Sequence, residues 1–258
     1  MPMPAPLAWW IRRCRLMAAL LLAAVACGGA TGAPPDEPGA RRVLFLGNSL
    51  TATNDLPAMV EALGAAAELP PIRTAAVTRS GANLQDLWDS TDARARVDRG
   101  GWDVVVMQQG PSSLPESERD LREWARRFAT AIRAAGARPA LYMVWPMAER
   151  AASFDAVSAS YAHAAADVDG MLFPVGEAWR AAWRRDAALP LYGPDNFHPS
   201  PTGTYLAALV MVSMLSGRSA IGLPTRVTVR GATLDVPASR AVLLQEAADE
   251  AIASFGRP

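Results

Sequence analysis

Three residues have types that can cooperate in nucleophilic chemistry: Ser49, and the neighbouring pair Asp195 and His198 about 150 residues later in the chain. Asp195 and His198 are separated by two residues in "PDNFHPSPTG", so the carboxylate can accept a hydrogen bond from the histidine ring within one turn. Such a bond fixes the ring tautomer and leaves the other ring nitrogen free as a base. Because a serine hydroxyl is a poor nucleophile until a base takes its proton, the pair predicts an activated serine elsewhere in the chain.

Ser49 is the candidate for that serine because of where the sequence places it. In "VLFLGNSLTATNDLP" a run of apolar residues leads directly into Gly47, Asn48 and Ser49. An isolated serine at such a place is most simply a turn residue. In a parallel sheet, however, ligands bind at the carboxyl ends of the strands, which is where Ser49 is expected.

Two further segments place hydrogen-bond donors at strand ends. Gly81 in "TRSGANL" follows a predicted strand, and Gln108 and Gln109 in "VVVMQQGPSS" follow another. Backbone N–H groups of Ser49 and Gly81, with one glutamine carboxamide, would supply three donors for a developing oxyanion. Gln108 is favoured because it follows the strand directly, and Gln109 stays open as the alternative.

The elements that must position these residues follow from alternating apolar runs and amphipathic segments. Short β-branched or aromatic runs predict strands at Val43–Leu46, Ile72–Val77, Val104–Met107, Ala140–Val144 and Met171–Val175. Helical patterns lie at Leu56–Glu68, Glu116–Ala135, Asp155–Asp167, Glu177–Ala187, Thr202–Leu215 and Ala238–Ser254. This alternation predicts a parallel sheet covered by helices on both faces, with a small hairpin in "VTVRGATLDV" before the last helix.

Composition narrows the classes of function. The chain has 258 residues, of which 51% are hydrophobic, and this suits one globular domain with a substantial core. Twenty-five basic residues balance 25 acidic ones, so no net field favours a nucleic acid. Every basic residue is arginine, which removes phosphate-binding and Schiff-base lysines. Only two histidines are present, and no metal or organic cofactor is implied.

The first 33 residues read as a signal peptide. Arg12, Arg13 and Arg15 precede an apolar run that is too short for a comfortable membrane span and is followed by small residues. Cys27 follows "LAAVA", which resembles a bacterial lipobox, so lipid attachment at Cys27 and ordinary cleavage a few residues later both remain open. Residues 34–40 form a linker, and residues 41–258 form the domain. The sequence thus predicts an exported protein that is periplasmic, extracellular or anchored to a membrane.

The strings "LGNSLT", "SGANL", "VVVMQQGPSS" and "DNFHPSPTGTYLAA" resemble, in order, the four signature blocks of the SGNH/GDSL hydrolases. The resemblance implies a three-layer α/β/α sandwich with a flavodoxin-like parallel sheet. It also implies Ser49 as nucleophile and first oxyanion donor, Gly81 as second donor, and Asp195 with His198 as the completing pair. The first block has Asn48 where an aspartate is usual, and the third block has glutamine in place of its usual asparagine.

Aromatic residues near the expected site have two interpretations. Trp145, after the fourth strand, and Tyr192 are expected to line the substrate pocket, although Trp145 could equally be core. Trp179 and Trp183 are four residues apart and are expected to pack, with sugar stacking as the alternative. His163 is expected to be a structural or surface residue.

The motifs together predict an esterase that hydrolyses a small ester, with an O-acetyl group on a carbohydrate as the candidate substrate. Two alternatives remain open. One is a catalytically impaired glycan-binding domain of the same fold, and the other is an O-acyltransferase that uses the same residues. The oligomeric state is not indicated by the sequence.

Overall fold

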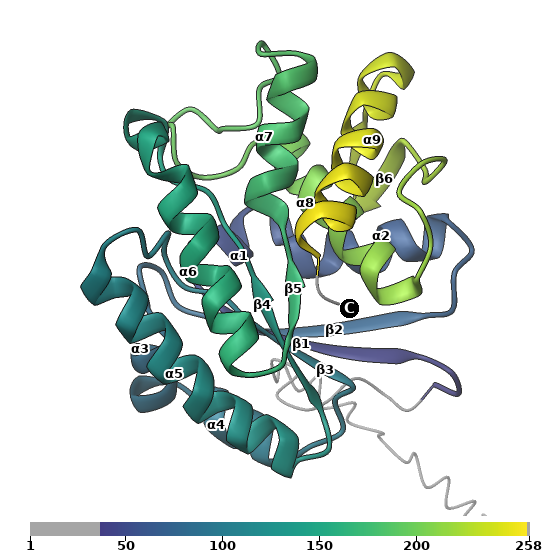
Figure 1. The fold of residues 1–258 in the computed structure, drawn as a ribbon. Coiled ribbons are helices and arrows are strands. Elements are labelled where there is room, and N and C mark those ends of the chain that lie inside the picture. Colours follow the sequence, from purple (N-terminus) through teal and green to yellow (C-terminus); the bar gives the residue numbers. More distant parts are fainter. Residues whose placement is uncertain (1–36, 257–258) are drawn as a thin grey trace, which may run out of the picture. The chain divides into compact units, whose positions relative to one another are not determined.

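A five-stranded parallel sheet forms the centre of the domain (Figure 1). The computed structural model describes residues 37–256. In sheet order the strands are β2 (Ile72–Thr78), β1 (Arg41–Gly47), β3 (Val104–Met107), β4 (Arg138–Tyr142) and β5 (Met171–Phe173). This order and the covering helices confirm the predicted three-layer α/β/α fold.

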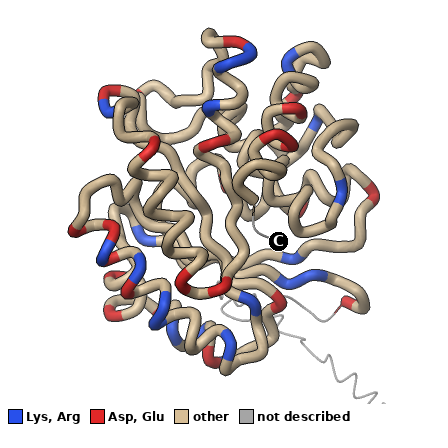
Figure 2. Tube along the Cα trace, viewed as in Figure 1, with Lys and Arg blue, Asp and Glu red and all other residues tan. Residues whose placement is uncertain are grey.

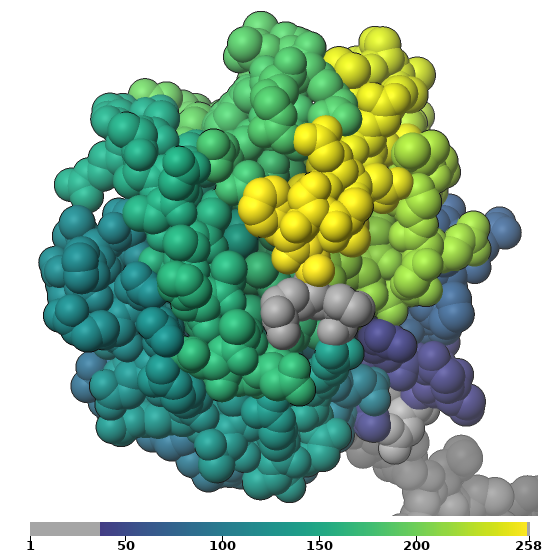
Figure 3. All heavy atoms as spheres, viewed as in Figure 1, coloured from purple at the N-terminus to yellow at the C-terminus, as the bar shows by residue number. Residues whose placement is uncertain are grey.

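Two groups of helices cover opposite sides of the sheet (Figure 1). One group contains α3 (Leu84–Ser90), α4 (Ala93–Asp98), α5 (Pro115–Ala134) and α6 (Phe154–Asp167). The other contains α2 (Leu56–Ala66), α7 (Val175–Arg185), α8 (Pro201–Ser216) and α9 (Ala238–Phe255). Within the second group, α9 packs on α7. Figure 3 shows α9, in yellow, lying against α7, in green.

The interior strand β1 is apolar on both faces. Val43, Leu44, Phe45 and Leu46 are all buried, because helices cover the sheet on both sides and no residue of the run faces solvent. The strand therefore reads as a continuous apolar run, and it delivers Gly47 and the following turn to the carboxyl edge of the sheet.

Helix α8 is buried almost all round and follows directly after the Asp195–His198 turn. Ser200 caps its N-terminus, and the Ser200 hydroxyl accepts a hydrogen bond from the Gly203 N–H at 3.0 Å. A side chain at Gly203 would collide with the Leu191 carbonyl and with the Trp179 ring. This close approach fixes the start of α8 against the segment that carries the histidine.

The remaining elements are short. They are α1 (Ser49–Ala52), the 3-10 turns η1 (Thr53–Asp55) and η2 (Ala148–Ser153), and the antiparallel hairpin of β6 (Arg226–Val229) and β7 (Ala232–Asp235). The hairpin lies where the sequence predicted it. The fourth strand ends at Tyr142, two residues before its predicted end, although Met143 and Val144 stay buried and the Met143 N–H still donates to the Phe173 carbonyl at 3.1 Å.

The predicted signal peptide, Cys27 and most of the linker lie outside the described residues. Within residues 37–256, no helix combines the length and apolar character that a membrane crossing requires.

Candidate active site

Ser49 is the first residue of α1, directly after the turn that ends β1. Asn48 caps this helix, and its side-chain oxygen accepts a hydrogen bond from the Leu50 N–H at 3.0 Å. Gly47 has no room for a side chain, because a Cβ there would meet Thr51 and the Gln108 carboxamide. The strand end, the glycine and the cap together present Ser49 at the carboxyl edge of the sheet.

The structure brings Ser49, His198 and Asp195 together. The Ser49 Oγ lies 2.8 Å from His198 Nε2, although 149 residues separate them in the chain. On the other side of the ring, His198 Nδ1 lies 2.5 Å from Asp195 Oδ2. With Nδ1 protonated and donating to the carboxylate, Nε2 is free to accept the Ser49 proton.

The Asp195 carboxylate is held by the turn that contains it. Its Oδ1 accepts hydrogen bonds from the backbone N–H groups of Phe197 (3.1 Å) and His198 (2.9 Å). The hydrogen bond with the His198 ring, followed by these two backbone bonds, lowers the pKa of Asp195 to about 2. The carboxylate therefore stays ionised over the whole neutral range and stabilises an imidazolium form of His198 when one develops.

Hydrogen bonds from other elements hold the turn in place. Trp145 Nε1 donates to the Phe197 carbonyl at 2.9 Å, and the Ala148 N–H donates to the Asn196 carbonyl at 2.9 Å. From η1, Asn54 Nδ2 donates to the Pro199 carbonyl at 3.0 Å. None of these supports was identified from the sequence, because each one joins residues about 50 to 150 positions apart.

The prediction that Trp145 lines a substrate pocket is wrong. Its ring is fully buried and stacks on Trp179 with ring centroids 3.6 Å apart. Tyr192 belongs to the same aromatic cluster, because its ring packs on Trp179 and Trp183. Its hydroxyl donates to the Pro146 carbonyl at 2.6 Å. Trp179 and Trp183 therefore pack in this aromatic cluster, as the sequence favoured.

Gly81 lies on a loop that is attached to the Ser49 turn at both ends. The Arg79 N–H donates to the Gly47 carbonyl at 3.2 Å, and Asn48 Nδ2 donates to the Ala82 carbonyl at 3.0 Å. Gly81 itself is exposed and has a φ of +71°, a conformation that glycine adopts without strain. Among the described residues, no hydrogen bond engages the N–H of Gly81 or of Ser49.

The Gln108 carboxamide is fully buried beneath the Ser49 turn. Its Oε1 accepts from the Asn48 N–H (2.9 Å) and the Thr51 hydroxyl (2.8 Å). Its Nε2 donates to Asn48 Oδ1 (3.0 Å) and the Gln109 carbonyl (2.5 Å). Both N–H bonds are used, which corrects the expectation that Gln108 offers a free oxyanion donor.

Gln109 is likewise occupied. Its Nε2 donates to the Ser112 hydroxyl at 2.9 Å, and its Oε1 accepts from the Leu84 N–H at 3.1 Å. The Tyr161 hydroxyl from α6 donates to the Gln109 carbonyl at 2.7 Å. Burial raises the pKa of Tyr161, so this hydroxyl remains protonated and available as a donor. In this arrangement neither glutamine points a free N–H at Ser49.

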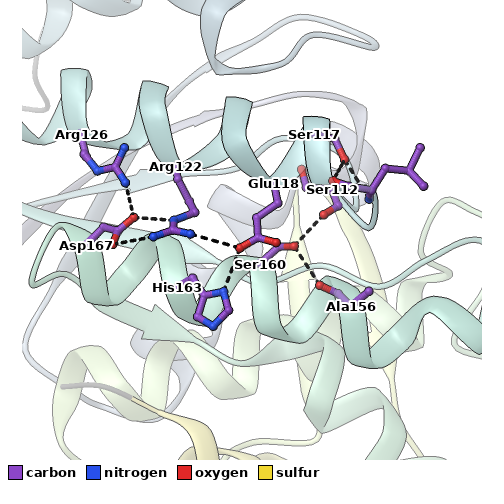
Figure 4. A network of polar contacts seen from close by, with 10 residues as sticks. Ser112, Ser117, Glu118, Arg122, Arg126, Ala156, Ser160, His163 and Asp167 are labelled. Carbon is purple, nitrogen blue, oxygen red and sulfur yellow. Dashed lines mark hydrogen bonds and ion pairs between the residues drawn. The ribbon is translucent and has the colours of Figure 1, made fainter.

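His163 lies away from the site, in a surface network between α5 and α6 (Figure 4). Its Nδ1 is 2.8 Å from a Glu118 oxygen, and its side chain is 57% exposed. Arg122 and Arg126 both contact the Asp167 carboxylate in the same network. This matches the expectation that His163 is a structural or surface residue.

Comparison with known proteins identifies the family. A protein from Slackia heliotrinireducens, assigned to the SGNH hydrolases, is 32% identical to this chain. The match covers 68% of this chain and 99% of that protein, with a TM-score of 0.57. The chain belongs to the SGNH/GDSL hydrolase family. No family model and no curated protein sequence matches it.

Two more distant solved structures share the SGNH hydrolase fold. A DUF4886 family protein from Bacteroides uniformis is 17% identical, with a TM-score of 0.69, and the match covers 83% of this chain and 95% of that one. An acetyl xylan esterase, AlAXEase, is 14% identical, with a TM-score of 0.56, and the match covers 67% of this chain and 98% of that one. At these identities the likeness concerns the fold alone.

Proposed function

We propose that this SGNH hydrolase is a serine esterase that cleaves small esters through Ser49, His198 and Asp195. The observation that carries the proposal is the continuous hydrogen-bonded line from Ser49 Oγ through the His198 ring to Asp195. A base within hydrogen-bond reach of a hydroxyl is the geometry that general base catalysis requires. Membership of a hydrolase family supports the same reaction class.

The proposed reaction has two halves. His198 Nε2 takes the Ser49 proton while Ser49 Oγ attacks the ester carbonyl, and the resulting oxyanion lies near the free N–H groups of Ser49 and Gly81. The bond to the alcohol oxygen then breaks, and His198 returns the proton to that oxygen. Water attacks the acyl-serine in the same manner, which releases the carboxylic acid and restores the Ser49 hydroxyl.

An O-acetyl group on a carbohydrate is the proposed natural substrate. The fold likeness to an acetyl xylan esterase is consistent with this choice. Gln108 is proposed to support the Ser49 turn from below, so that the two backbone amides carry the oxyanion. Hydrolysis of p-nitrophenyl acetate by the wild type and by Ser49→Ala tests the activity directly. Equal rates for the two proteins would favour the glycan-binding alternative.

The acyltransferase alternative predicts a different product. A transferase would pass the acyl group from Ser49 to an added alcohol in preference to water, so its release of acetate would fall as the acceptor concentration rises. An esterase releases one acetate for each ester consumed at all acceptor concentrations. Comparing acetate with transferred acetyl ester in one reaction separates the two.

Export is also proposed, on the strength of residues 1–33. Cell fractionation of the full chain and of a Cys27→Ser variant tests it. A lipid-anchored protein moves from the membrane fraction to the soluble fraction on this substitution, and a simply cleaved protein does not. Retention in the cytoplasm would contradict export.

A further inference from the structure

A cavity of about 360 Å³ is lined in part by the turn that carries Asp195 and His198, through Phe197. One wall comes from Pro111 and Ser113 in the loop between β3 and α5 and from Ser117 in the first turn of α5. The other wall comes from Met147 and Arg150, around the start of η2, and Phe197 completes the lining. The lining combines apolar surface with hydroxyl groups, which is typical of sites that bind small polar ligands.

The cavity adjoins the histidine side of the site. Phe197 directly precedes His198, and the two rings meet edge to face with centroids 5.2 Å apart. In the proposed mechanism His198 returns its proton to the alcohol oxygen of the ester. The alcohol part of the substrate leaves on the His198 side of the site, and the Phe197 ring connects that side to this cavity.

Arg150 is the single charged side chain that lines the cavity. It is exposed, and within residues 37–256 no carboxylate pairs with its guanidinium. The adjacent carboxylate of Glu149 accepts a hydrogen bond from Asn196 Nδ2 at 3.2 Å. The cavity therefore has an uncompensated positive charge, unlike the helix surface where Arg122 and Arg126 share Asp167.

The backbone beneath Arg150 is fixed relative to the reacting residues. The Arg150 N–H donates to the Met147 carbonyl at 2.9 Å, and the Ser153 hydroxyl donates to the Arg150 carbonyl at 2.8 Å. Just before it, the Ala148 N–H donates to the Asn196 carbonyl in the Asp195–His198 turn. The backbone that carries the Arg150 side chain is thus attached to the turn carrying the base.

We propose that this cavity binds the alcohol part of an ester that carries a carboxylate, with Arg150 as its partner. A carboxylated sugar bearing an O-acetyl group has the required chemistry. The planar guanidinium can donate two parallel hydrogen bonds to a carboxylate, and the hydroxyls of the cavity can contact the sugar. The inference rests on the esterase function proposed above, and it names the substrate class of the same site.

A matched pair of substrates tests the inference on the whole protein. The pair is O-acetylated methyl glucoside and O-acetylated methyl glucuronoside, which differ in the carboxylate. We expect kcat/KM to be about fivefold to tenfold higher for the carboxylated ester, as for a partly exposed charged hydrogen bond. Arg150→Ala should remove most of this preference through a higher KM, and Arg150→Lys should retain part of it. The preference should also fall as salt concentration rises.

Arg218→Ala is the control, because Arg218 is exposed at the end of α8 and does not line the cavity. This variant should keep the wild-type preference. Equal rates for the two esters in the wild type, or a preference that survives in Arg150→Ala, would overturn the inference. A preference lost instead in Arg79→Ala, beside Gly81, would also overturn it. Absence of hydrolysis of both esters would show that the proposed function itself is wrong.

Discussion

At the scale of single residues, the proposed chemistry depends on Ser49 and His198 acting as one unit. We expect Ser49→Ala and His198→Ala each to lower kcat by about 10⁴-fold or more, and the double variant to lose little beyond either. Asp195→Asn should leave a measurable remainder, because the aspartate orients the ring and touches no substrate atom. Initial rates of p-nitrophenyl acetate hydrolysis compare these four variants with the wild type. If the kcat losses of Ser49→Ala and His198→Ala multiplied in the double variant, the two residues would not act in the same step.

The low pKa of Asp195 gives a prediction for the pH profile. A carboxylate whose pKa is depressed to about 2 in the folded protein remains charged above about pH 4. If activity falls between pH 8 and pH 5, we therefore expect the cause to be protonation of a group other than Asp195. A descending limb near pH 4 that vanishes in Asp195→Asn would contradict this assignment.

Substitutions at and around Gln108 can distinguish two roles of its side chain. One is to support the turn that carries Ser49, and the other is to contact the oxyanion directly. Gln108→Ala should lower kcat by about a hundredfold under either interpretation, whereas Gln109→Ala should be milder. Thr51→Val separates them, because it removes only the hydroxyl that donates to Gln108 Oε1. If Gln108 supports the turn, Thr51→Val should lower kcat several-fold and lower the melting temperature. Unchanged kcat in this variant would favour direct contact.

At the scale of elements, the aromatic cluster offers a matched pair of substitutions. Trp145 and Trp179 are both fully buried and stack on each other, but only Trp145 Nε1 has a hydrogen-bond partner. We expect Trp145→Phe to free the Phe197 carbonyl, to loosen the Asp195–His198 turn and to lower kcat several-fold. Trp179→Phe removes an unpartnered N–H, so its kcat should stay close to that of the wild type. Equal effects on kcat would assign both rings to packing alone.

Much of the element pattern could be predicted because it is local. The run Val104–Met107 has the same bounds in the sequence prediction and in the sheet, since Asp and Gln flank four buried apolar residues. Helices α3 and α4 were missed because they are short and have few apolar residues. The hydrogen bond between the Asp195 carboxylate and the His198 ring was predicted for the same local reason, since only two residues separate them.

The errors in the site have a common physical cause. The sequence shows that Gln108 follows a strand and that Trp145 follows another, but the burial of each depends on partners far along the chain. Gln108 meets Asn48, and Trp145 meets Phe197. A polar or aromatic residue at a strand end can therefore face the ligand or support the loop, and the chain position alone does not decide between them.

At the scale of the whole molecule, charges of both signs are spread over the surface (Figure 2). Several ion pairs join helices within a layer. Asp167 on α6 contacts Arg122 and Arg126 on α5, and Glu250 on α9 contacts Arg184 on α7. The hydrogen bond from Arg122 lowers the pKa of Asp167, and that from Arg184 lowers the pKa of Glu250. Both helical layers thus contain carboxylates that favour the ionised form in the folded state.

These shifts predict how stability depends on pH. A carboxylate with a depressed pKa stabilises the fold fully above its ordinary value near 4 and loses that contribution as pH falls through its folded value. Burial raises the pKa of Asp120, so its protonation works in the opposite direction. We expect the melting temperature to be nearly constant from pH 7 to pH 5 and to fall below about pH 4. Each exposed pair contributes at most about 1 kcal/mol.

The double variant Asp167→Asn with Glu250→Gln tests whether these two carboxylates cause the fall of the melting temperature below pH 4. It should melt a few degrees below the wild type at pH 7, since about 1 kcal/mol corresponds to roughly 2–4 °C in a domain of this size. Its melting temperature should also fall less steeply than that of the wild type below pH 4, because the two groups no longer titrate. Asp89→Asn, an exposed carboxylate with no ion pair among the described residues, should leave the slope unchanged. An unchanged slope in the double variant would place the acid sensitivity in other carboxylates, such as Asp195.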